Sequence, residues 1–191
     1  MNFLAHAYLS FNNPEILTGN MIGDFVKGRD FTHLPTDIQK GVQLHRKIDY
    51  FTDKHEFFKK SVYRISDIHG KYRFVIVDLF YDHFLAENWA EYHNFKLKQF
   101  TDNTYSTLHN NEIHLPEKFK FALGYMEKND WLYNYQYLDK LEMFIKGISN
   151  RSKYGNNLET SIEDLKSDYK YFESDFKLFF EDVISFSKSE I

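Results

Sequence analysis

The stretch FVIVDLFYDHFLA, residues 74–86, decides the fold class of this chain of 191 residues. Ten of its thirteen residues are apolar, and the three exceptions are Asp78, Asp82 and His83. A helix that is apolar on every side is normally buried, and a buried carboxylate without a partner costs on the order of several kcal/mol. The stretch therefore predicts a buried helix whose polar side chains have a specific reason to be inside the protein.

Apolar residues recur at helical spacing on both sides of this stretch. Asn13 followed by Pro14 is typical of a helix start and Gly28 of a stop, and we expect Thr52 and Asp53 to cap the start of a further helix. We expect helices over residues 14–28, 36–51, 54–70, 72–92, 117–135, 139–151 and 158–186. Strand-like alternation is scarce, so the sequence predicts an all-α, single-domain helical bundle comprising residues 1–191.

The composition limits the environment in which the chain works. Aromatic residues make up 19% of it, including 20 Phe and 14 Tyr, so we expect a core built mainly from rings. No apolar run approaches the roughly 20 residues that span a bilayer, and the N-terminal residues do not read as a signal peptide. The lack of cysteine excludes disulfides and thiolate metal ligands, and it agrees with a cytoplasmic protein without a membrane partner.

The charge is unevenly distributed, although the net charge is only −4. Residues 1–75 carry 11 Lys or Arg against 8 Asp or Glu, whereas residues 76–191 carry 13 against 20. The basic surplus of the first part can attract an acidic partner by electrostatic steering, although a mixed, solvated surface accounts equally well for the counts. No dense basic run occurs, so we expect no nucleic-acid partner.

Polar residues fall on other apolar helix faces as well. His45, Asp49 and Thr52 have i, i+4 and i+7 spacing on the inward face of the helix that begins at Thr36. The same i, i+4 spacing relates Asn20 to Asp24 and Asp78 to Asp82, and His6 lies in the apolar segment NFLAHAYL. Inward carboxylates and imidazoles can converge on a divalent metal, whose charge offsets the cost of their desolvation. Nitrogen and oxygen ligands without sulfur suit Mn²⁺, Fe²⁺ or Mg²⁺.

Each of these residues also has an ordinary structural interpretation. An inward histidine is more often a satisfied core residue than a ligand, Asp78 can pair with Arg46 or Arg73, and Asp49 can pair with Arg46 or Lys47. We expect Asp53 to be a helix-start residue. We expect the histidines in polar surroundings to lie on the surface: His33, His55, His93, His109 and His114. The gathering of the inward polar residues in the first half of the chain favours a site.

Several catalytic classes are excluded by their missing motifs. The chain has no H-E-x-x-H, Walker-A, G-x-S-x-G or G-x-G-x-x-G motif. It has no Glu-x-x-His pair of the kind that ferritin-like di-iron sites use and no cysteine nucleophile. Hydrolysis by a metal-activated water is the chemistry that remains.

Four motifs make the sequence similar to a known family: MNFLAHAYLS, GNMIGDFVKG, GVQLHRKIDYFTDKH and DLFYDHFLAENW. They resemble the acyl carrier protein phosphodiesterases, also called acyl carrier protein hydrolases, and NDWLYNY and ISNRSKYG look like the C-terminal signatures of that family. The resemblance extends over roughly residues 1–155. It implies an all-helical, HD-like phosphohydrolase architecture and a divalent metal, typically Mn²⁺. It also implies hydrolysis of the phosphodiester that joins 4′-phosphopantetheine to a serine of holo-acyl carrier protein, an acidic helical partner.

The resemblance also implies roles for residues within the matching motifs. Asp24 is the strongest candidate for metal binding or catalysis. The remaining core ligands are His45, Asp82 and His83, with His6, Asp49 and Asp78 as additional ligands or supporting residues. HD proteins carry His before Asp in their doublet, whereas Asp82 precedes His83 here, so the ligand assignment departs from the usual pattern.

Cationic residues and proton transfer complete the expected mechanism. Lys27, Arg46 and Arg151 are expected to contact phosphate, Asp24 or Asp82 to orient the attacking water, and His83 to bind metal or protonate the leaving alkoxide. The expected docking face for the carrier consists of Lys27, Lys40, Lys47, Lys54, Lys59 and Lys60. Two alternatives stay open, namely an HD-like phosphohydrolase of nucleotides or other small phosphodiesters, and a carrier-binding homologue without turnover.

Overall fold

The computed structural model describes residues 1–28, 30–152 and 157–191, and every regular element within them is helical. The α-helices are α1 (Phe3–Tyr8), α2 (Pro14–Ile22), α3 (Thr36–Lys54), α4 (Glu56–Arg64), α5 (Arg73–Glu87), α6 (Trp89–Tyr92), α7 (Leu97–Asn110), α8 (Glu117–Lys128), α9 (Trp131–Asn134), α10 (Leu138–Arg151), α11 (Ser161–Ser167) and α12 (Tyr169–Ser189). Short 3-10 helices are η1 (Gly23–Phe25), η2 (Asp67–Tyr72), η3 (Glu112–His114) and η4 (Leu158–Thr160). The predicted all-α class is confirmed. Among the described helices, none has the length and apolar character of a membrane span.

The predicted helix start at Thr52 and Asp53 is wrong. Both residues lie in the last turn of α3, where the Thr52 hydroxyl donates to the Ile48 carbonyl at 2.8 Å instead of capping a new helix. The chain turns only at His55, whose φ of −67° and ψ of 136° are extended. The helices α1 and α7 are not among those predicted.

Three predicted helices are each divided into two α-helices. The helix predicted over residues 54–70 ends at Arg64 and is followed by η2, and α2 ends at Ile22 rather than near Gly28. Asn and Asp occupy the division points because their short polar side chains tolerate backbone conformations outside the helical region. The divisions lie at Asn88 between α5 and α6, at Asp130 between α8 and α9, and at Asp168 between α11 and α12.

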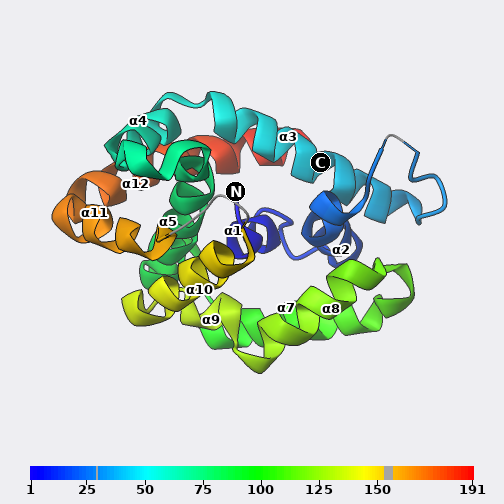
Figure 1. Cartoon of the computed structure of the whole chain (residues 1–191). Helices are drawn as coiled ribbons and strands as arrows, with labels where there is room; N and C mark the ends of the chain where they lie inside the picture. Colours follow the sequence, from blue (N-terminus) through cyan, green and yellow to red (C-terminus); the bar gives the residue numbers. More distant parts are fainter. Residues whose placement is uncertain (29, 153–156) are drawn as a thin grey trace.

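Aromatic rings pack α5 against α12, as the composition predicted. Phe80 contacts Phe172 with ring centroids 5.5 Å apart, and Tyr81 contacts Phe176 at 5.4 Å. All four side chains are fully buried. Helix α5 is therefore the internal helix that its sequence predicted, and it lies beside α1 near the middle of the molecule (Figure 1).

Two glycines bring α2 and α3 into backbone contact. A Cβ atom at Gly19 would lie 2.0 Å from the Ile38 carbonyl oxygen, and one at Gly41 would lie 2.2 Å from the Ile16 carbonyl oxygen. Any other residue at these positions would force the helices apart. Their close packing sets the inward residues of α2 against those of α3, on the side where α1 lies (Figure 1).

Candidate metal centre

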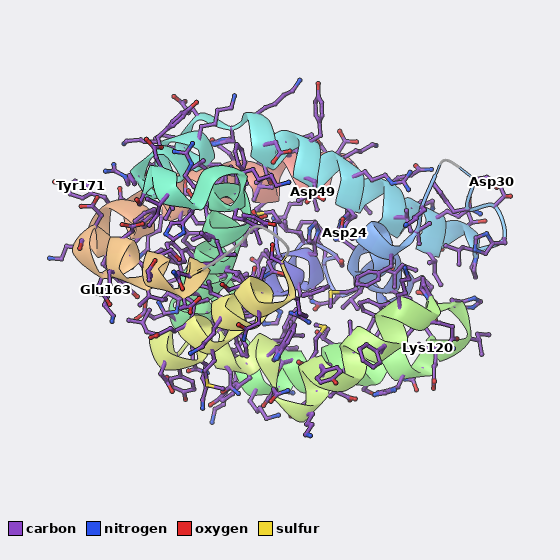
Figure 2. The ribbon with its side chains drawn as sticks, viewed as in Figure 1. Asp24, Asp30, Asp49, Lys120, Glu163 and Tyr171 are labelled. Atoms are coloured by element: carbon purple, nitrogen blue, oxygen red, sulfur yellow. The ribbon has the colours of Figure 1, made fainter. Side chains whose placement is uncertain are left out.

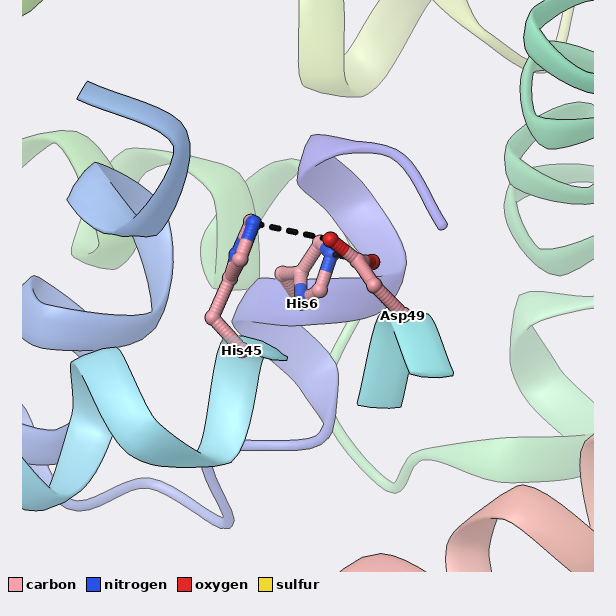
Figure 3. A group of neighbouring side chains, drawn as sticks. All are labelled: His6, His45 and Asp49. Carbon is pink, nitrogen blue, oxygen red and sulfur yellow. Dashed lines mark ion pairs between the residues drawn. The ribbon is translucent and has the colours of Figure 1, made fainter. Parts of the chain in front are cut away.

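Three residues from two helices meet in a compact cluster (Figure 3). His6 comes from α1, whereas His45 and Asp49 come from successive turns of α3. Asp49 Oδ1 lies 3.2 Å from His6 Nε2, and Asp49 Oδ2 lies 3.1 Å from His45 Nε2. The imidazole rings stack with centroids 4.0 Å apart. One potential ligand atom from each residue lies within 4.8 Å of the others.

Asn20 of α2 orients both imidazoles. His6 Nδ1 lies 2.7 Å from Asn20 Oδ1, and His45 Nδ1 lies 2.7 Å from the Asn20 backbone oxygen. The Asn20 amide nitrogen donates to the His6 carbonyl oxygen and to Ser10 Oγ, which fixes the direction of the amide. Because an oxygen acceptor requires a proton on each Nδ1, the neutral rings present an unprotonated Nε2 to the cluster. The predicted site did not include Asn20, although an amide on an apolar helix face is the signal that points to it.

The two Nε2 atoms are buried, and they make no hydrogen bond within the described part of the chain. Their contacts with Asp49 are close enough for an ion pair but do not have hydrogen-bond geometry. Buried polar atoms without a partner are rare in folded proteins. Two imidazole nitrogens and a carboxylate are a donor set that a divalent transition metal accepts, so the residues fit a metal.

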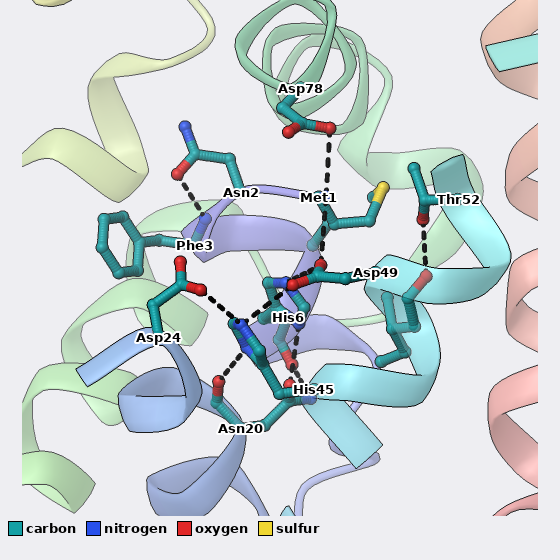
Figure 4. A network of polar contacts seen from close by, with 12 residues as sticks. Met1, Asn2, Phe3, His6, Asn20, Asp24, His45, Asp49, Thr52 and Asp78 are labelled. Carbon is teal, nitrogen blue, oxygen red and sulfur yellow. Dashed lines mark hydrogen bonds and ion pairs between the residues drawn. The ribbon is translucent and has the colours of Figure 1, made fainter. Parts of the chain in front are cut away.

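Asp24 stands at the exposed edge of the cluster (Figures 2 and 4). Its Oδ1 lies 3.3 Å from His45 Nε2, and its side chain is 78% exposed. The preceding Gly23 makes this approach possible, because a Cβ atom there would lie 2.2 Å from His45 Cγ. Asp24 is therefore close to the candidate ligands and also accessible to a substrate from solvent.

The protonation of the cluster is set by burial and by its carboxylates. Burial lowers the pKa of His6 to about 4. Burial also acts to lower the pKa of His45, but Asp24 and Asp49 outweigh it and raise that pKa to about 9. The imidazoles hold the pKa of Asp49 well below its usual range despite its burial, and His45 lowers that of Asp24. Near neutral pH without a metal, His6 is neutral and His45 is protonated.

Asp78 lies one contact away from the three clustered residues (Figure 4). The Met1 α-amino nitrogen is 3.0 Å from Asp78 Oδ1 and 3.4 Å from Asp49 Oδ1, so it connects the two carboxylates. Burial raises the pKa of Asp78 to about 6. The alternative pairing of Asp78 with Arg73 is wrong, because Arg73 forms its ion pair with Asp67.

Asp82 is not brought to the cluster, contrary to the expectation that it is a core ligand. Its two carboxylate oxygens accept hydrogen bonds from the backbone nitrogens of Leu4 at 2.8 Å and Ala5 at 3.0 Å. Its side chain is fully buried, and burial raises its pKa to about 7 although both hydrogen bonds favour the charged form. Asp82 holds the first turn of α1, and it thereby positions His6.

His83 is also placed away from the cluster. Its Nδ1 lies 2.8 Å from the Tyr135 carbonyl oxygen, and its Nε2 lies 2.8 Å from the Tyr169 hydroxyl. Both ring nitrogens are thus engaged in contacts that join α5 to the α9 region and to α12. We do not retain His83 as a ligand or as the acid for the leaving group.

The expected phosphate contacts do not form one group. Arg46 donates to the carbonyl oxygens of Val26 and Gly28, both at 2.8 Å, and not to either of its expected partners, Asp49 and Asp78. Arg151 is exposed, and its Nε donates to the carbonyl oxygen of Gly147 at 3.0 Å. Lys27 is exposed, three positions after Asp24.

Three of the six expected docking lysines form ion pairs with neighbours in the same chain. Lys40 pairs with Asp37, Lys47 with Glu190 and Lys60 with Asp175. Lys54 contacts the Tyr50 hydroxyl. Within the described residues, Lys27 and Lys59 form no ion pair. The geometry therefore gives little support to a single basic face.

The expectation of surface histidines holds only in part. His33 and His109 are exposed, whereas His93 and His114 are half-buried. The side chain of His55 is only 11% exposed, and its ring packs on Phe179 with centroids 5.0 Å apart. Its polar neighbours in sequence gave no sign of this aromatic contact, which comes from α12.

Comparisons with known proteins identify the family of the chain. The family model described as acyl carrier protein phosphodiesterase matches residues 1–183 and so extends beyond the roughly 155 residues of the expected resemblance. Proteins named acyl carrier protein phosphodiesterase from Salmonella paratyphi A, Salmonella agona and Salmonella newport are each 30% identical over 188 residues, which is 94% of both chains.

No solved structure matches the chain significantly. The expected signature ISNRSKYG, residues 148–155, lies partly outside the described residues. The match of the family model does not depend on that signature, because it covers nearly the whole chain. The chain belongs to the acyl carrier protein phosphodiesterase family.

Proposed function

We propose that this chain hydrolyses the phosphodiester between 4′-phosphopantetheine and a serine of holo-acyl carrier protein, and that it does so with a divalent metal. The metal would be held by His6, His45 and Asp49, with Mn²⁺ as the first candidate and Mg²⁺ or Fe²⁺ as alternatives. The observation that carries the proposal is the pair of buried Nε2 atoms that lack a hydrogen bond and face the same carboxylate.

A metal bound there would polarise a phosphoryl oxygen and lower the pKa of a coordinated water. Asp24 is the residue of this group that reaches both the cluster and solvent, so its carboxylate is suited to orient the attacking water and to accept its proton. The water oxygen forms a bond to phosphorus, the bond from phosphorus to the serine oxygen breaks, and the serine oxygen takes up a proton from solvent. The products are 4′-phosphopantetheine and the carrier with a free serine hydroxyl.

Two of the residues act by holding the others in place. Asn20 fixes the tautomers and the directions of both imidazoles through its side-chain and backbone oxygens. Asp82 holds the start of α1 and therefore the position of His6. The substrate assignment rests on the names of the relatives and on the family. The HD-like relationship stays a prediction.

A mass measurement on holo-acyl carrier protein tests the proposal. With Mn²⁺ present, the carrier should lose a group of roughly 340 Da, which is the expected product of the hydrolysis. Removal of divalent metals by a chelator, or the substitution His45→Ala, should stop the loss. His109→Ala is the matched control, because His109 is an exposed histidine that pairs with Glu127 away from the cluster.

The same measurement separates the alternatives. Binding of the carrier with no change in its mass would favour a carrier-binding homologue without turnover. Cleavage of nucleotide or other small phosphodiesters, with the carrier left intact, would favour a different HD-like phosphohydrolase. Either result would overturn the proposed substrate.

A further inference from the structure

A groove is lined by residues that follow Asp24 in the chain, starting with Phe25. The loop that follows Asp24 forms one wall through Val26 and Leu34, and the turn from α7 to α8 forms the other through Leu115. The groove has a volume of about 400 Å³. Phe25 lines the groove and is covalently joined to Asp24, so the groove and the cluster are connected through adjacent residues. The proposed mechanism does not use this space.

Both walls of the groove are held in place by contacts within the chain. Arg46 donates hydrogen bonds of 2.8 Å to the carbonyl oxygens of Val26 and Gly28, and its guanidinium lies over the Phe31 ring at 5.1 Å. On the other side, the Phe25 ring packs edge-on against Phe119 of α8 with centroids 5.2 Å apart. These contacts fix the shape of the groove, and Arg46 holds the loop that forms one of its walls.

The lining combines apolar surface with positive or protonatable groups. Lys27, His33 and His114 line the groove, and Lys27 has no ion pair within the described residues. The one acidic lining residue, Asp30, already accepts hydrogen bonds from the backbone nitrogen and the hydroxyl of Thr32. The groove thus suits a ligand with an apolar, hydrogen-bonding body and a negative charge near Asp24 and Lys27.

We infer that this groove binds the pantetheine arm of the substrate while the phosphate lies at the metal cluster. This inference rests on the proposed function. From its phosphate outward, the arm carries a branched apolar segment and then two amide groups. Phe25 and Val26, which follow Asp24 in the chain, offer apolar surface to the branched segment, and the His33 and His114 side chains of the lining offer hydrogen-bonding groups to the amides. The size of the arm also suits a site of this volume, since pockets for small ligands begin near about 300 Å³.

A second groove also has a volume of about 400 Å³. It lies between α7 and the N-terminal end of α2, and its lining includes Asn12, Pro14 and Ser106. Asp24 follows the C-terminal end of α2 instead. Nine helical residues separate the two ends by roughly 13 Å. The second groove therefore lies at the opposite end of α2 from Asp24 and serves as the comparison site for the test.

The test uses D-pantetheine, which lacks the phosphate and so reports on the groove rather than on the metal. Binding to the full-length protein, measured by saturation-transfer NMR, should be lost in Val26→Trp, which fills the groove. The KM for holo-acyl carrier protein should rise about tenfold, the equivalent of losing about 1.4 kcal/mol of binding, while metal affinity stays unchanged. Ser106→Trp is the matched control in the second groove, and it should change neither quantity.

A second variant tests the groove independently, in case Val26→Trp does not fold. Ile113 is 86% exposed at the rim of the groove, so Ile113→Asp should fold normally and still weaken pantetheine binding and raise the KM. The inference is overturned if pantetheine does not bind the wild-type protein. It is also overturned if both groove variants behave like wild type, or if Ser106→Trp has the same effect as they do. The mass of the carrier decides the proposed function separately, because pantetheine binding does not require turnover.

Discussion

Helices α3 and α5 both carry aspartate and histidine on buried surfaces, but they use these side chains differently. In α3, the Nε2 of His45 has no hydrogen bond and faces Asp49, which also approaches His6. In α5, the polar atoms of Asp82 and His83 are occupied by partners from distant parts of the chain. Burial of a polar side chain therefore does not identify a ligand. What distinguishes the α3 cluster is that two buried imidazole nitrogens without a hydrogen bond face the same carboxylate.

The difference arises from what each helix meets. The first turn of any helix has backbone nitrogens without internal acceptors, and α5 places the Asp82 carboxylate against that end of α1. Helix α3 instead meets the side of α1 and the Asn20 turn of α2, which present the His6 ring and two oxygen acceptors. Asp82 and His83 of α5 therefore make structural contacts, whereas His45 of α3 keeps a nitrogen atom without a hydrogen bond.

Replacing one histidine from each helix should give the largest contrast. His45→Ala removes a proposed ligand, so metal affinity should fall by more than about 100-fold, beyond the 10–100-fold typical of residues that only support a ligand. His83→Ala should lower the free energy of unfolding by about 1–3 kcal/mol, because it leaves the buried Tyr135 carbonyl oxygen without its hydrogen bond to His83, with metal affinity nearly unchanged. Calorimetric titration and chemical denaturation measure the two effects. Similar metal affinities in the two variants would remove the distinction between the helices.

Gly23→Ala tests the close approach of η1 to α3. The new Cβ would lie 2.2 Å from His45 Cγ, so the imidazole has to move out of line with Asp49. We expect metal affinity to fall by about 10–100-fold, which is the usual effect of mutating a residue that orients a metal ligand. Gly147→Ala is the control, because its Cβ meets only an Arg151 nitrogen at 3.9 Å and a helical Ala is more stable than Gly by about 1 kcal/mol. Unchanged metal binding in Gly23→Ala would mean that His45 is not a ligand.

Asp82→Asn tests whether α5 acts on the site through α1. An amide cannot accept from both Leu4 and Ala5, so we expect a loss of about 1–3 kcal/mol in the free energy of unfolding. We also expect metal affinity to fall about tenfold, because His6 loses the fixed start of its helix. Denaturation and calorimetric titration measure these two quantities.

The control for Asp82 is another buried carboxylate at a distance from the site. Asp175 of α12 has a side chain that is 2% exposed and pairs with Lys60 at 3.1 Å and Arg64 at 3.3 Å. Asp175→Asn should destabilise the protein without changing metal affinity. If the two variants differ from wild type only in stability, Asp82 is a purely structural residue and its link to His6 is absent.

The sequence predicted the helical class and the inward direction of most site residues because both follow from local spacing. His6, Asp24, His45 and Asp49 lie together through contacts of 3.1–3.3 Å, whereas their role as metal ligands stays a prediction. The sequence did not separate them from Asp82, whose partners Leu4 and Ala5 lie 78 and 77 positions away. Which atoms of a buried residue are already engaged is decided by such long-range contacts, and local periodicity contains no information about them.

The pH dependence of metal binding gives a finer test of the α3 cluster. The pKa of His45 is raised to about 9, whereas that of His6 is lowered to about 4, so of the two imidazoles only His45 carries a proton between pH 6 and 9. A metal competes with that proton. Affinity should therefore fall about tenfold for each pH unit below 9 and should level off above it. For the metal-free protein, the raised pKa of His45 adds stability below its unfolded value near 6.5, and this contribution disappears as the pH rises through 9.

Calorimetry in buffers of different ionisation enthalpy counts the protons that metal binding releases. At pH 7 the count should be close to one for the wild-type protein, because only one of the two imidazoles is charged. Asp24→Asn should lower the count, since Asp24 is one of the two carboxylates that hold the proton on His45. His83→Gln should not alter it, because His83 belongs to the contacts of α5. A count near two, or one that changes with His83, would place α5 inside the metal site after all.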